Sequence, residues 1–379
     1  MNKEQAKELL DKYNKGLANA EEKLLLENWY LQESGTQVFS DENADFLFLK
    51  EEIWKGTRQK AGLEGVKKAV KWKPYSRIAA VLALIACCTC LYIKIAQRQQ
   101  KEKNFIAASK IIAGRNQAIL TLADGSKVLL NDAPNGTIAK QAGLTVTKTK
   151  DGELVYLTSA TTQADAPPAY HRVETPKGGQ YQVILPDGTH VWLNAASSLR
   201  YPPVFKGSAR TVQVTGEAYF EVTKDPKKPF RVESDNQIIE VLGTQFNINA
   251  YKDEPRVTTT LLEGSVKILN LKNNATVLLN PGEQSALSSK GLRVTHVDPE
   301  QFVAWKNDKF IFTNANIESI MRQVSRWYNV TVEYRGDMSE EKFGGRTSRF
   351  SNLAELLEII ELTDHVHFEI EGRRIIVMR

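Results

Sequence analysis

Cysteine and histidine are scarce in this chain, whose 379 residues include three cysteines and five histidines. The cysteines, Cys87, Cys88 and Cys90, lie within one short apolar segment, so the sequence offers neither a disulfide framework nor a cysteine metal site. It also lacks a glycine-rich phosphate loop in a strand-to-helix context and a recognisable order of Ser, His and Asp for nucleophilic catalysis. Catalysis therefore has little support, and we predict neither an enzyme nor a cofactor-binding protein.

Long hydrophobic runs are also rare, and one stretch differs from the otherwise soluble pattern. Residues Ile78 to Ile93 read IAAVLALIACCTCLYI and are flanked by Arg77 and Lys94. These sixteen residues would span about 24 Å as a helix, against roughly 30 Å for the hydrocarbon core of a bilayer. Two further apolar residues extend the run, and the flanking cations can reach the membrane interface. We therefore predict one transmembrane helix over residues 77–96.

Charge is segregated on the N-terminal side of this segment. Residues 1–53 carry six Lys and Arg against twelve Asp and Glu, whereas residues 54–77 carry eight against Glu64 alone. The second stretch is typical of a juxtamembrane segment that faces anionic lipid. Lys and Arg close to the helix number seven before it and five after it, which favours a cytoplasmic N-terminus. We therefore predict that residues 1–76 form a cytoplasmic head and that the larger part of the chain lies across the membrane.

The head is predicted to be a small all-α region. One helix is expected over residues 5–13, a second opens with a capping box from Asn19 to Glu22, and a third follows near residues 42–53. Three short helices form a marginal core on their own, so their large apolar residues either fill that core or are covered by a partner. If a partner binds, the expected docking residues are Leu25, Trp29, Tyr30, Ile53 and Trp54.

Beyond a polar linker over residues 97–113, the sequence changes to β-branched runs separated by turns. Two segments repeat, LADGSKVLLNDA (Leu122 to Ala133) and LPDGTHVWLNAA (Leu185 to Ala196), with seven of twelve positions identical. In each segment Asp-Gly is the expected turn of a two-stranded hairpin, where glycine supplies a positive φ. Further strand pairs with Gly and Pro turns follow, so residues 114–300 are predicted to form an all-β domain.

The last part of the chain, residues 301–379, alternates strands and helices. A strand over residues 309–313 precedes a helix with one apolar face, made of Ile317, Ile320, Met321, Val324 and Tyr328. A second helix places Leu353, Leu356, Leu357 and Ile360 at helical spacing, and strands follow both helices. This order predicts a small α+β domain with two βαβ-like halves.

Two groups of residues could indicate a catalytic or metal-binding site, and each also has a simpler structural interpretation. Glu217 and Glu221 lie about 13 Å apart along one predicted strand, beyond the roughly 5 to 9.5 Å that separates paired catalytic carboxylates. We interpret them as part of a polar or hydrogen-bonded strand face. His365 and His367 share a strand face with Glu369, and we interpret them as solvated edge residues rather than metal ligands.

Six motifs occur in order in the predicted β domain. They are TPKGGQYQVILPDGTHVWLNAASSLRYP (Thr175–Pro202), VTGEAYFEV (Val214–Val222), KKPFRV (Lys227–Val232), VLGTQFNINAY (Val241–Tyr251), LLEGSVKI (Leu261–Ile268) and LNPGEQ (Leu279–Gln284). Together they resemble the FecR family of transmembrane anti-sigma factors. WKNDKFIF and VSRWYNVTVEY resemble the accessory domain appended to these proteins, which is similar to the short N-terminal fold of secretin and TonB-linked proteins. LLDKY and EEKLLLENWY resemble the cytoplasmic start of the family.

The resemblance implies a regulator of transcription that does not touch nucleic acid itself. The head would bind an extracytoplasmic-function sigma factor at the bacterial inner membrane and withhold it from RNA polymerase. The periplasmic part would receive a signal from the signalling domain of an outer-membrane TonB-dependent transporter. Site proteases would then free the sigma factor.

The resemblance also implies a bond that can break by itself. Some family members cleave a Gly-Thr bond through an acyl shift from nitrogen to the threonine hydroxyl, and Gly243-Thr244 occupies the matching place. Glycine permits the strained geometry that such an attack requires. The simpler interpretation is a strand-end glycine followed by an ordinary threonine.

A membrane-anchored periplasmic glycan-binding or cell-wall protein is the alternative from another functional class. Its sugar platforms would be exposed side chains of Trp192, Trp305 or Trp327, although the strand and helix patterns around these residues indicate a core. Association of the head with a sigma factor distinguishes the two functions.

Overall fold

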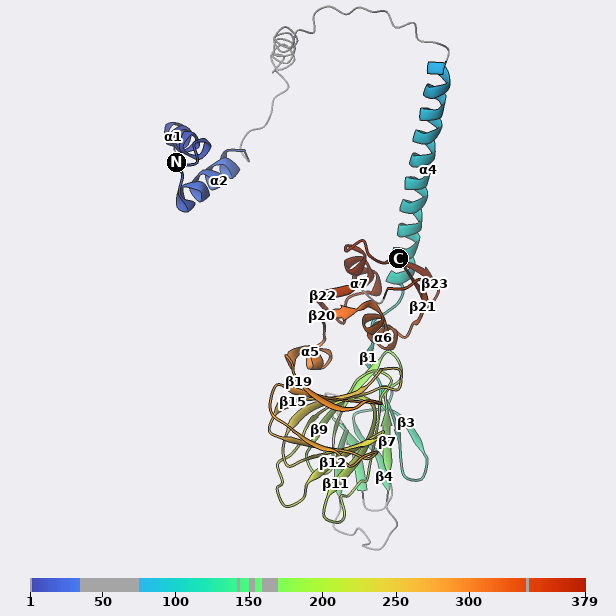
Figure 1. Ribbon diagram of the computed structural model, residues 1–379. Helices are drawn as coiled ribbons and strands as arrows, with labels where there is room; N and C mark the ends of the chain where they lie inside the picture. The colour runs from blue at the N-terminus through green and yellow to red at the C-terminus, as the bar shows by residue number, and fades with distance from the viewer. Residues whose placement is uncertain (1, 35–74, 142–143, 150–153, 159–169, 339–340) are drawn as a thin grey trace, which may run out of the picture. The chain divides into compact units, whose positions relative to one another are not determined.

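The computed structural model describes residues 2–34, 75–141, 144–149, 154–158, 170–338 and 341–379 (Figure 1). The chain divides into two compact units, Met1–Cys87 and Cys88–Arg379. The third helix predicted for the head, with Ile53 and Trp54, lies outside the described residues.

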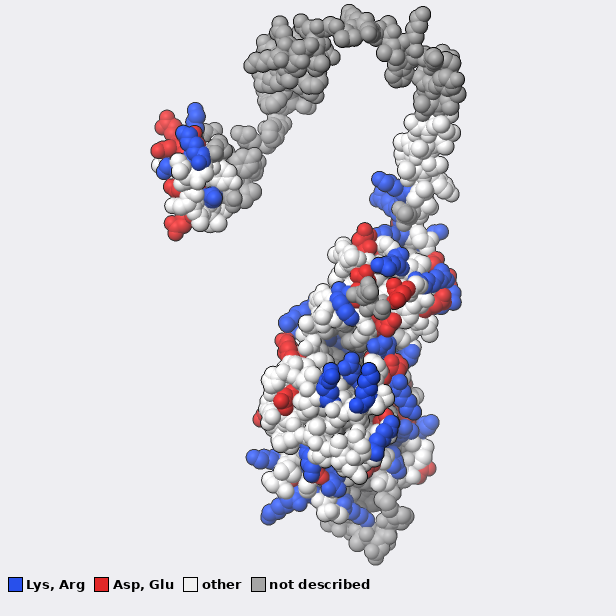
Figure 2. All heavy atoms as spheres, in the orientation of Figure 1, with Lys and Arg blue, Asp and Glu red and all other residues white. Residues whose placement is uncertain are grey.

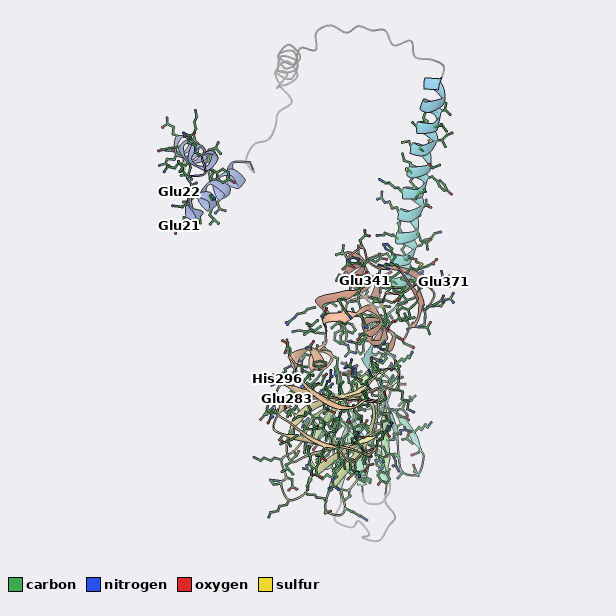
Figure 3. All side chains as sticks on the ribbon, viewed as in Figure 1. Glu21, Glu22, Glu283, His296, Glu341 and Glu371 are labelled. Carbon is green, nitrogen blue, oxygen red and sulfur yellow. The ribbon has the colours of Figure 1, made fainter. Side chains whose placement is uncertain are left out.

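The described part of the head is a pair of helices, α1 (Lys3–Asn14) and α2 (Ala20–Ser34). The capping box predicted at Asn19 is present, because the Glu22 N–H donates to Asn19 Oδ1 and the Asn19 N–H donates to Glu22 Oε2, both at 2.9 Å. Glu22 lies in the acidic first turn of α2 (Figure 3), where negative charge stabilises the helix N-terminus. Its carboxylate is also 3.5 Å from Lys12 Nζ on α1.

One long helix, α4 (Tyr75–Ser109), contains the predicted membrane span. From Val81 to Ser109 it is long and apolar enough to cross a membrane, and its apolar window is not buried within the protein. Figure 2 shows uncharged side chains along this part of the chain, followed by a cluster of Lys and Arg. Residues 97–109, which the sequence predicts as a linker, continue the helix because Gly and Pro are absent before Gly114.

A β-rich domain follows and encloses one apolar core, which confirms the predicted β-rich central region (Figure 1). Its strands are β1 (Arg115–Asn116), β2 (Ile119–Thr121), β3 (Lys127–Leu129), β4 (Gly136–Gln141), β5 (Leu144–Lys148), β6 (Leu154–Thr158), β7 (His171–Glu174), β8 (Gly179–Ile184), β9 (His190–Leu193), β10 (Ser198–Tyr201), β11 (Arg210–Glu221), β12 (Phe230–Ser234), β13 (Gln237–Val241), β14 (Gln245–Ala250), β15 (Val257–Glu263), β16 (Val266–Asn270), β17 (Thr276–Leu279), β18 (Glu283–Ser288) and β19 (Gly291–His296). Strands that are neighbours in sequence pair antiparallel for the most part, as short turns require.

The two repeated segments form the predicted hairpins, since β2 pairs antiparallel with β3 and β8 pairs antiparallel with β9. Gly125 and Gly188 occupy the turns with φ of +83° and +82°. The aspartate before each glycine accepts a hydrogen bond from the backbone N–H two residues on, at 2.9 Å for Asp124 and 3.1 Å for Asp187. These are the turn residues that a tight hairpin favours.

Strand β11 changes partners along its length. Its first half pairs with β10 and β12, and its second half, from Gly216 on, pairs with β9 and β14. Gly216 lies at the change with φ of +81°, and a Cβ there would be 2.4 Å from Ser197 Oγ. Only glycine fits this point, which fixes the position of the next residue, Glu217.

The C-terminal part combines helices and two small sheets. Its elements are α5 (Glu300–Val303), a 3₁₀ turn (Ala304–Asn307), β20 (Lys309–Asn316), α6 (Ile317–Tyr328), β21 (Thr331–Arg335), β22 (Lys342–Ser348), α7 (Leu353–Glu361), β23 (His367–Glu371) and β24 (Arg374–Met378). The apolar faces predicted for α6 and α7 are buried.

The strand pairing of this part differs from two simple βαβ halves. β20 pairs with β22, whereas β24 lies between β21 and β23 in a separate three-stranded sheet. The last strand takes the central place because Ile375, Ile376 and Val377 are all fully buried. Strands on either side of each helix therefore belong to different sheets.

Candidate functional site

Charged and amide side chains are buried where the β domain meets the C-terminal elements, within residues 88–379. The cluster consists of Asn194, Glu217, Asn247, Trp305, Arg326 and Arg349, and we call it the seam. Each of these side chains is less than a tenth exposed. Burial of polar and charged groups is unfavourable unless they are hydrogen-bonded, so this concentration marks a specific arrangement.

Glu217 is the acidic centre of the seam. Asn194 Nδ2 donates to Glu217 Oε2 at 2.7 Å, and Asn247 Nδ2 donates to Glu217 Oε1 at 3.1 Å. Burial raises the pKa of Glu217 above its usual range, while the two amide donors and the nearby arginines Arg326 and Arg349 oppose that rise. The predicted hydrogen-bonded strand face is present here.

Arg349, which follows β22, crosses the seam from the other side. Its guanidinium donates to Asn194 Oδ1 at 2.8 Å, to the Trp305 carbonyl at 2.8 Å and to Gln180 Oε1 at 3.2 Å. It also lies 3.8 Å from the centre of the Trp327 ring. Burial lowers the pKa of Arg349 to about 10. Asn194 thus links the buried carboxylate of Glu217 to the buried guanidinium of Arg349.

Helix α6 adds a second set of ion pairs. Arg326 donates to both carboxylate oxygens of Asp253, at 3.0 and 3.1 Å, and to Glu254 at 2.7 Å, while Arg322 reaches Glu254 at 2.9 Å. The Arg326 guanidinium lies 3.9 Å from the centre of the Tyr251 ring. Nη1 of Arg326 thus binds Asp253 and Nη2 binds Glu254, so two carboxylates fix the orientation of one guanidinium.

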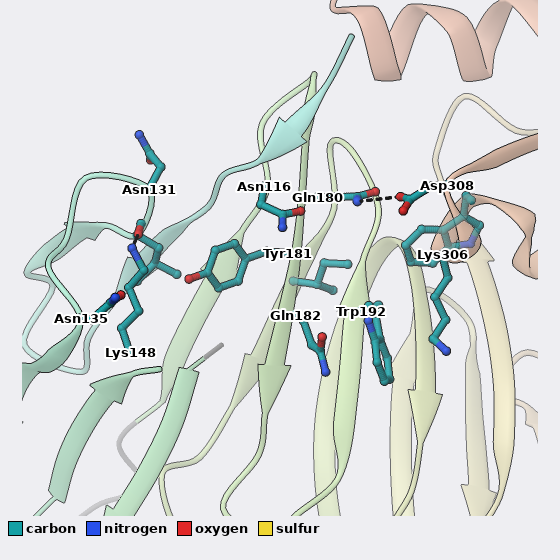
Figure 4. Close-up of a pocket in the computed structure, with 13 residues that line it drawn as sticks. Asn116, Asn131, Asn135, Lys148, Gln180, Tyr181, Gln182, Trp192, Lys306 and Asp308 are labelled. Carbon is teal, nitrogen blue, oxygen red and sulfur yellow. Dashed lines mark hydrogen bonds between the residues drawn. The ribbon is translucent and has the colours of Figure 1, made fainter. Parts of the chain in front are cut away.

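A polar cleft of about 410 Å³ opens beside the seam (Figure 4). Gln180 points across it and donates to Asp308 Oδ1 at 3.4 Å. Lys306 lies 4.3 Å from the centre of the Trp192 ring and pairs with Glu221 at 3.1 Å. One face of the Trp192 ring is therefore already in contact with the Lys306 ammonium group.

The tryptophans named for the glycan-binding alternative do not form exposed platforms. Trp327 is fully buried, and its indole N–H donates to the Arg349 carbonyl at 2.7 Å. Trp305 is also buried and donates to Asn247 Oδ1 at 3.1 Å. Trp192 is half-buried beneath Lys306. All three rings contact other groups of the same chain, so the glycan-binding alternative loses the exposed tryptophans on which it depended.

The predicted cleavage bond lies between β13 and β14. Thr244 is buried, and its hydroxyl donates to the Ser265 carbonyl at 3.0 Å. A Cβ on Gly243 would be 2.7 Å from the Lys224 Cα, so the backbone is closely packed at this corner. Cleavage at Gly243-Thr244 stays a prediction.

The predicted docking residues of the head are partly described. Leu25 is 57% exposed on α2, and Trp29 is half-buried. The side chain of Tyr30, like Ile53 and Trp54, lies outside the described residues. Their role in docking stays a prediction.

Sequence reasoning singled out Glu217 but missed its partners in the seam. The sequence repeat offered one indication for Asn194, because Asn131 occupies the same position of the repeated hairpin 63 residues earlier. Asn131 is exposed and donates to Asp132 at 2.6 Å. Arg326 and Arg349 gave no local signal, because their partners are distant in sequence.

Comparison with known proteins agrees with this architecture. Residues 171–267 match the family described as FecR protein, and residues 309–377 match the family described as FecR, C-terminal. The chain carries two FecR-family domains. The resemblance of its motifs to that family is thereby confirmed.

Two solved structures are similar to this chain with its two FecR-family domains. Both are crystal structures of a putative anti-sigma factor from Parabacteroides distasonis ATCC 8503, determined at 2.50 and 1.65 Å resolution. The first is 27% identical with a TM-score of 0.52 and covers 55% of this chain and 99% of its own. The second is 28% identical with a TM-score of 0.51 and covers 54% of this chain and 97% of its own. No curated protein matches the chain.

Proposed function

We propose that this FecR-family protein is an anti-sigma factor of the bacterial inner membrane. One observation carries the proposal: the two FecR-family regions follow a candidate membrane helix, which in turn follows a helical head. The similar solved structures described as an anti-sigma factor support the same role.

In this proposal, residues 1–76 bind an extracytoplasmic-function sigma factor on the cytoplasmic side. The acidic balance of residues 1–53 suits contact with the basic, DNA-binding surface of such a factor. The exposed side chains of Leu24 and Leu25 on α2 supply an apolar centre for the contact. Residues beyond the span lie in the periplasm and receive the signal of an outer-membrane TonB-dependent transporter, after which site proteases release the sigma factor.

The experiment is co-purification of full-length protein from membranes with each extracytoplasmic-function sigma factor of the host. We expect one of them to co-purify, and Leu25→Asp to reduce recovery at least ten-fold, since a charge in an apolar contact costs about 1.4 kcal/mol or more. Lys7→Asp, an exposed change on α1, is the matched control. The proposal fails if no sigma factor co-purifies and deletion of the gene leaves sigma-dependent transcription unchanged.

A further inference from the structure

Strand β23 lies at one edge of the C-terminal three-stranded sheet, because β24 occupies the middle. An edge strand presents backbone N–H and C=O groups that can pair with another strand. On β23 the backbone groups that point outward include those of Phe368 and Ile370.

Two side chains from helices occupy this edge. Asn104 Nδ2 donates to the Phe368 carbonyl at 2.7 Å, and the Ile370 N–H donates to Asn104 Oδ1 at 3.4 Å. The Phe368 N–H donates to Glu361 Oε1 at 2.8 Å. The Asn104 amide therefore bonds the Phe368 carbonyl and the N–H two residues on, as the N–H and C=O of one residue in a parallel strand would.

Asn104 belongs to the end of α4, and this end is built into the C-terminal core. Lys101 Nζ lies 3.9 Å from the Glu361 carboxylate. Ala108 and Ile111 are buried in the same apolar cluster as Trp327. The helix that contains the candidate membrane span thus reaches the sheet edge directly (Figure 1).

We propose that the docked end of α4 closes the β23 edge, and that an extended peptide segment adding to this edge displaces Asn104 and undocks the helix. The occupant is an extended backbone, because the edge offers alternating donors and acceptors rather than an apolar pocket. Docking of α4 and strand addition are mutually exclusive, so each weakens the other by the same free energy. A contact at the sheet edge is thereby converted into a change in the helix that enters the membrane. This exchange of partners involves residues 101–371 and does not require sigma-factor binding.

Hydrogen exchange on full-length protein in lipid nanodiscs tests the closure. Asn104→Ala removes the acceptor of the Ile370 amide, so we expect that amide to exchange about five-fold faster, as loss of one hydrogen bond of about 1 kcal/mol predicts. Lys103→Ala, an exposed neighbour on the same helix, should leave the exchange unchanged. Equal exchange of Ile370 in the wild type and Asn104→Ala overturns the closure.

Strand addition is tested with a fluorescent peptide of sequence RRIIVMR, which copies residues 373–379 and so contains the strand with which β23 already pairs. We expect Asn104→Ala to bind it about five-fold more tightly than the wild type or Lys103→Ala in anisotropy titrations. Saturating peptide should also speed exchange in residues 101–109 of the wild type. Equal affinities, no binding, or unchanged exchange in this segment each overturn the displacement.

Discussion

At the scale of single residues, Glu217 shows how a buried charge is held. Its carboxylate receives amide N–H groups from two strands, and Asn194 connects it to Arg349. Such an arrangement contributes little net stability compared with an apolar core, but loss of one partner leaves an unpaired buried group. Glu217 therefore contributes more to the specific orientation of the C-terminal elements on the β domain than to the free energy that holds them together.

The buried carboxylate predicts a pH dependence. Because the pKa of Glu217 is raised in the folded state, the folded state binds the proton more readily than the unfolded state. This stabilising contribution is fully present below the usual value of 4.5 and is lost as pH rises through the folded pKa. We expect the wild type to lose stability relative to Glu217→Gln as pH rises from about 4 to 8, measured by urea unfolding with tryptophan fluorescence.

Glu221→Gln is the control for that series, since Glu221 is half-exposed and pairs with Lys306. We expect a change of no more than about 1 kcal/mol in the free energy of unfolding. Parallel pH curves for the wild type and Glu217→Gln would contradict the assignment to Glu217.

Thr244 carries a prediction about covalent chemistry. If the Gly243-Thr244 bond cleaves itself, the wild type will purify as two fragments, Thr244→Ser will still cleave, and Thr244→Ala will remain one chain. The hydroxyl is the attacking group, which serine keeps and alanine lacks. Mass spectrometry of freshly purified protein gives the answer, and an intact wild-type chain would show that the hydroxyl serves only its hydrogen bond to Ser265.

At the scale of elements, the chain after α4 passes very close to α6. A Cβ on Gly114 would be 2.5 Å from Trp327 Cε3, so this position tolerates only a hydrogen atom. The close approach lets the chain run from the helix into β1 without lifting α6 away from Arg349. Packing, rather than backbone conformation, is the reason for this glycine.

Gly114→Ala should therefore destabilise the protein by about 1–3 kcal/mol through overpacking against the indole. The expected measurement is a lower urea midpoint together with a shift in the emission of buried tryptophan. Gly345→Ala is the matched control, because no atom lies within 4 Å of the added Cβ. A Gly114→Ala variant as stable as Gly345→Ala would show that α6 can move aside.

Local patterns predicted most elements, and long-range partners explain what they missed. The apolar faces of α6 and α7 and the Asp-Gly hairpins depend on spacing within a few residues, and these were found. The pairing of β24 with β21 depends on contacts across more than 40 residues, which no local pattern encodes. The roles of Arg326 and Arg349 were not predicted for the same reason, because their partners lie 73 and 155 residues away in the sequence.

At the scale of the whole molecule, one helix is expected to separate two compartments. The apolar window of α4 follows the basic stretch of residues 54–77, and this order favours a cytoplasmic N-terminus. Residues beyond the helix would then fold in the periplasm.

Alkaline phosphatase fusions test this arrangement, because the enzyme is active only after export. We expect a fusion after Lys110 to be active and a fusion after Lys73 to be inactive, with activities that differ about ten-fold or more. Equal expression on immunoblots is the control. The reverse pattern would place the head outside the cytoplasm and would remove the proposed contact with a sigma factor.

The exposed Asn131 and the buried Asn194 are the same position in two copies of one hairpin. Asn131 shows how its counterpart would look in water, as an ordinary solvated amide on a strand end. If the C-terminal elements separated from the β domain, the newly wetted surface would include Asn194, Glu217 and Arg349 beside the rings of Tyr219 and Trp305. Water would then hydrate the amide and charged groups, which would offset part of the free energy that separating the two parts costs.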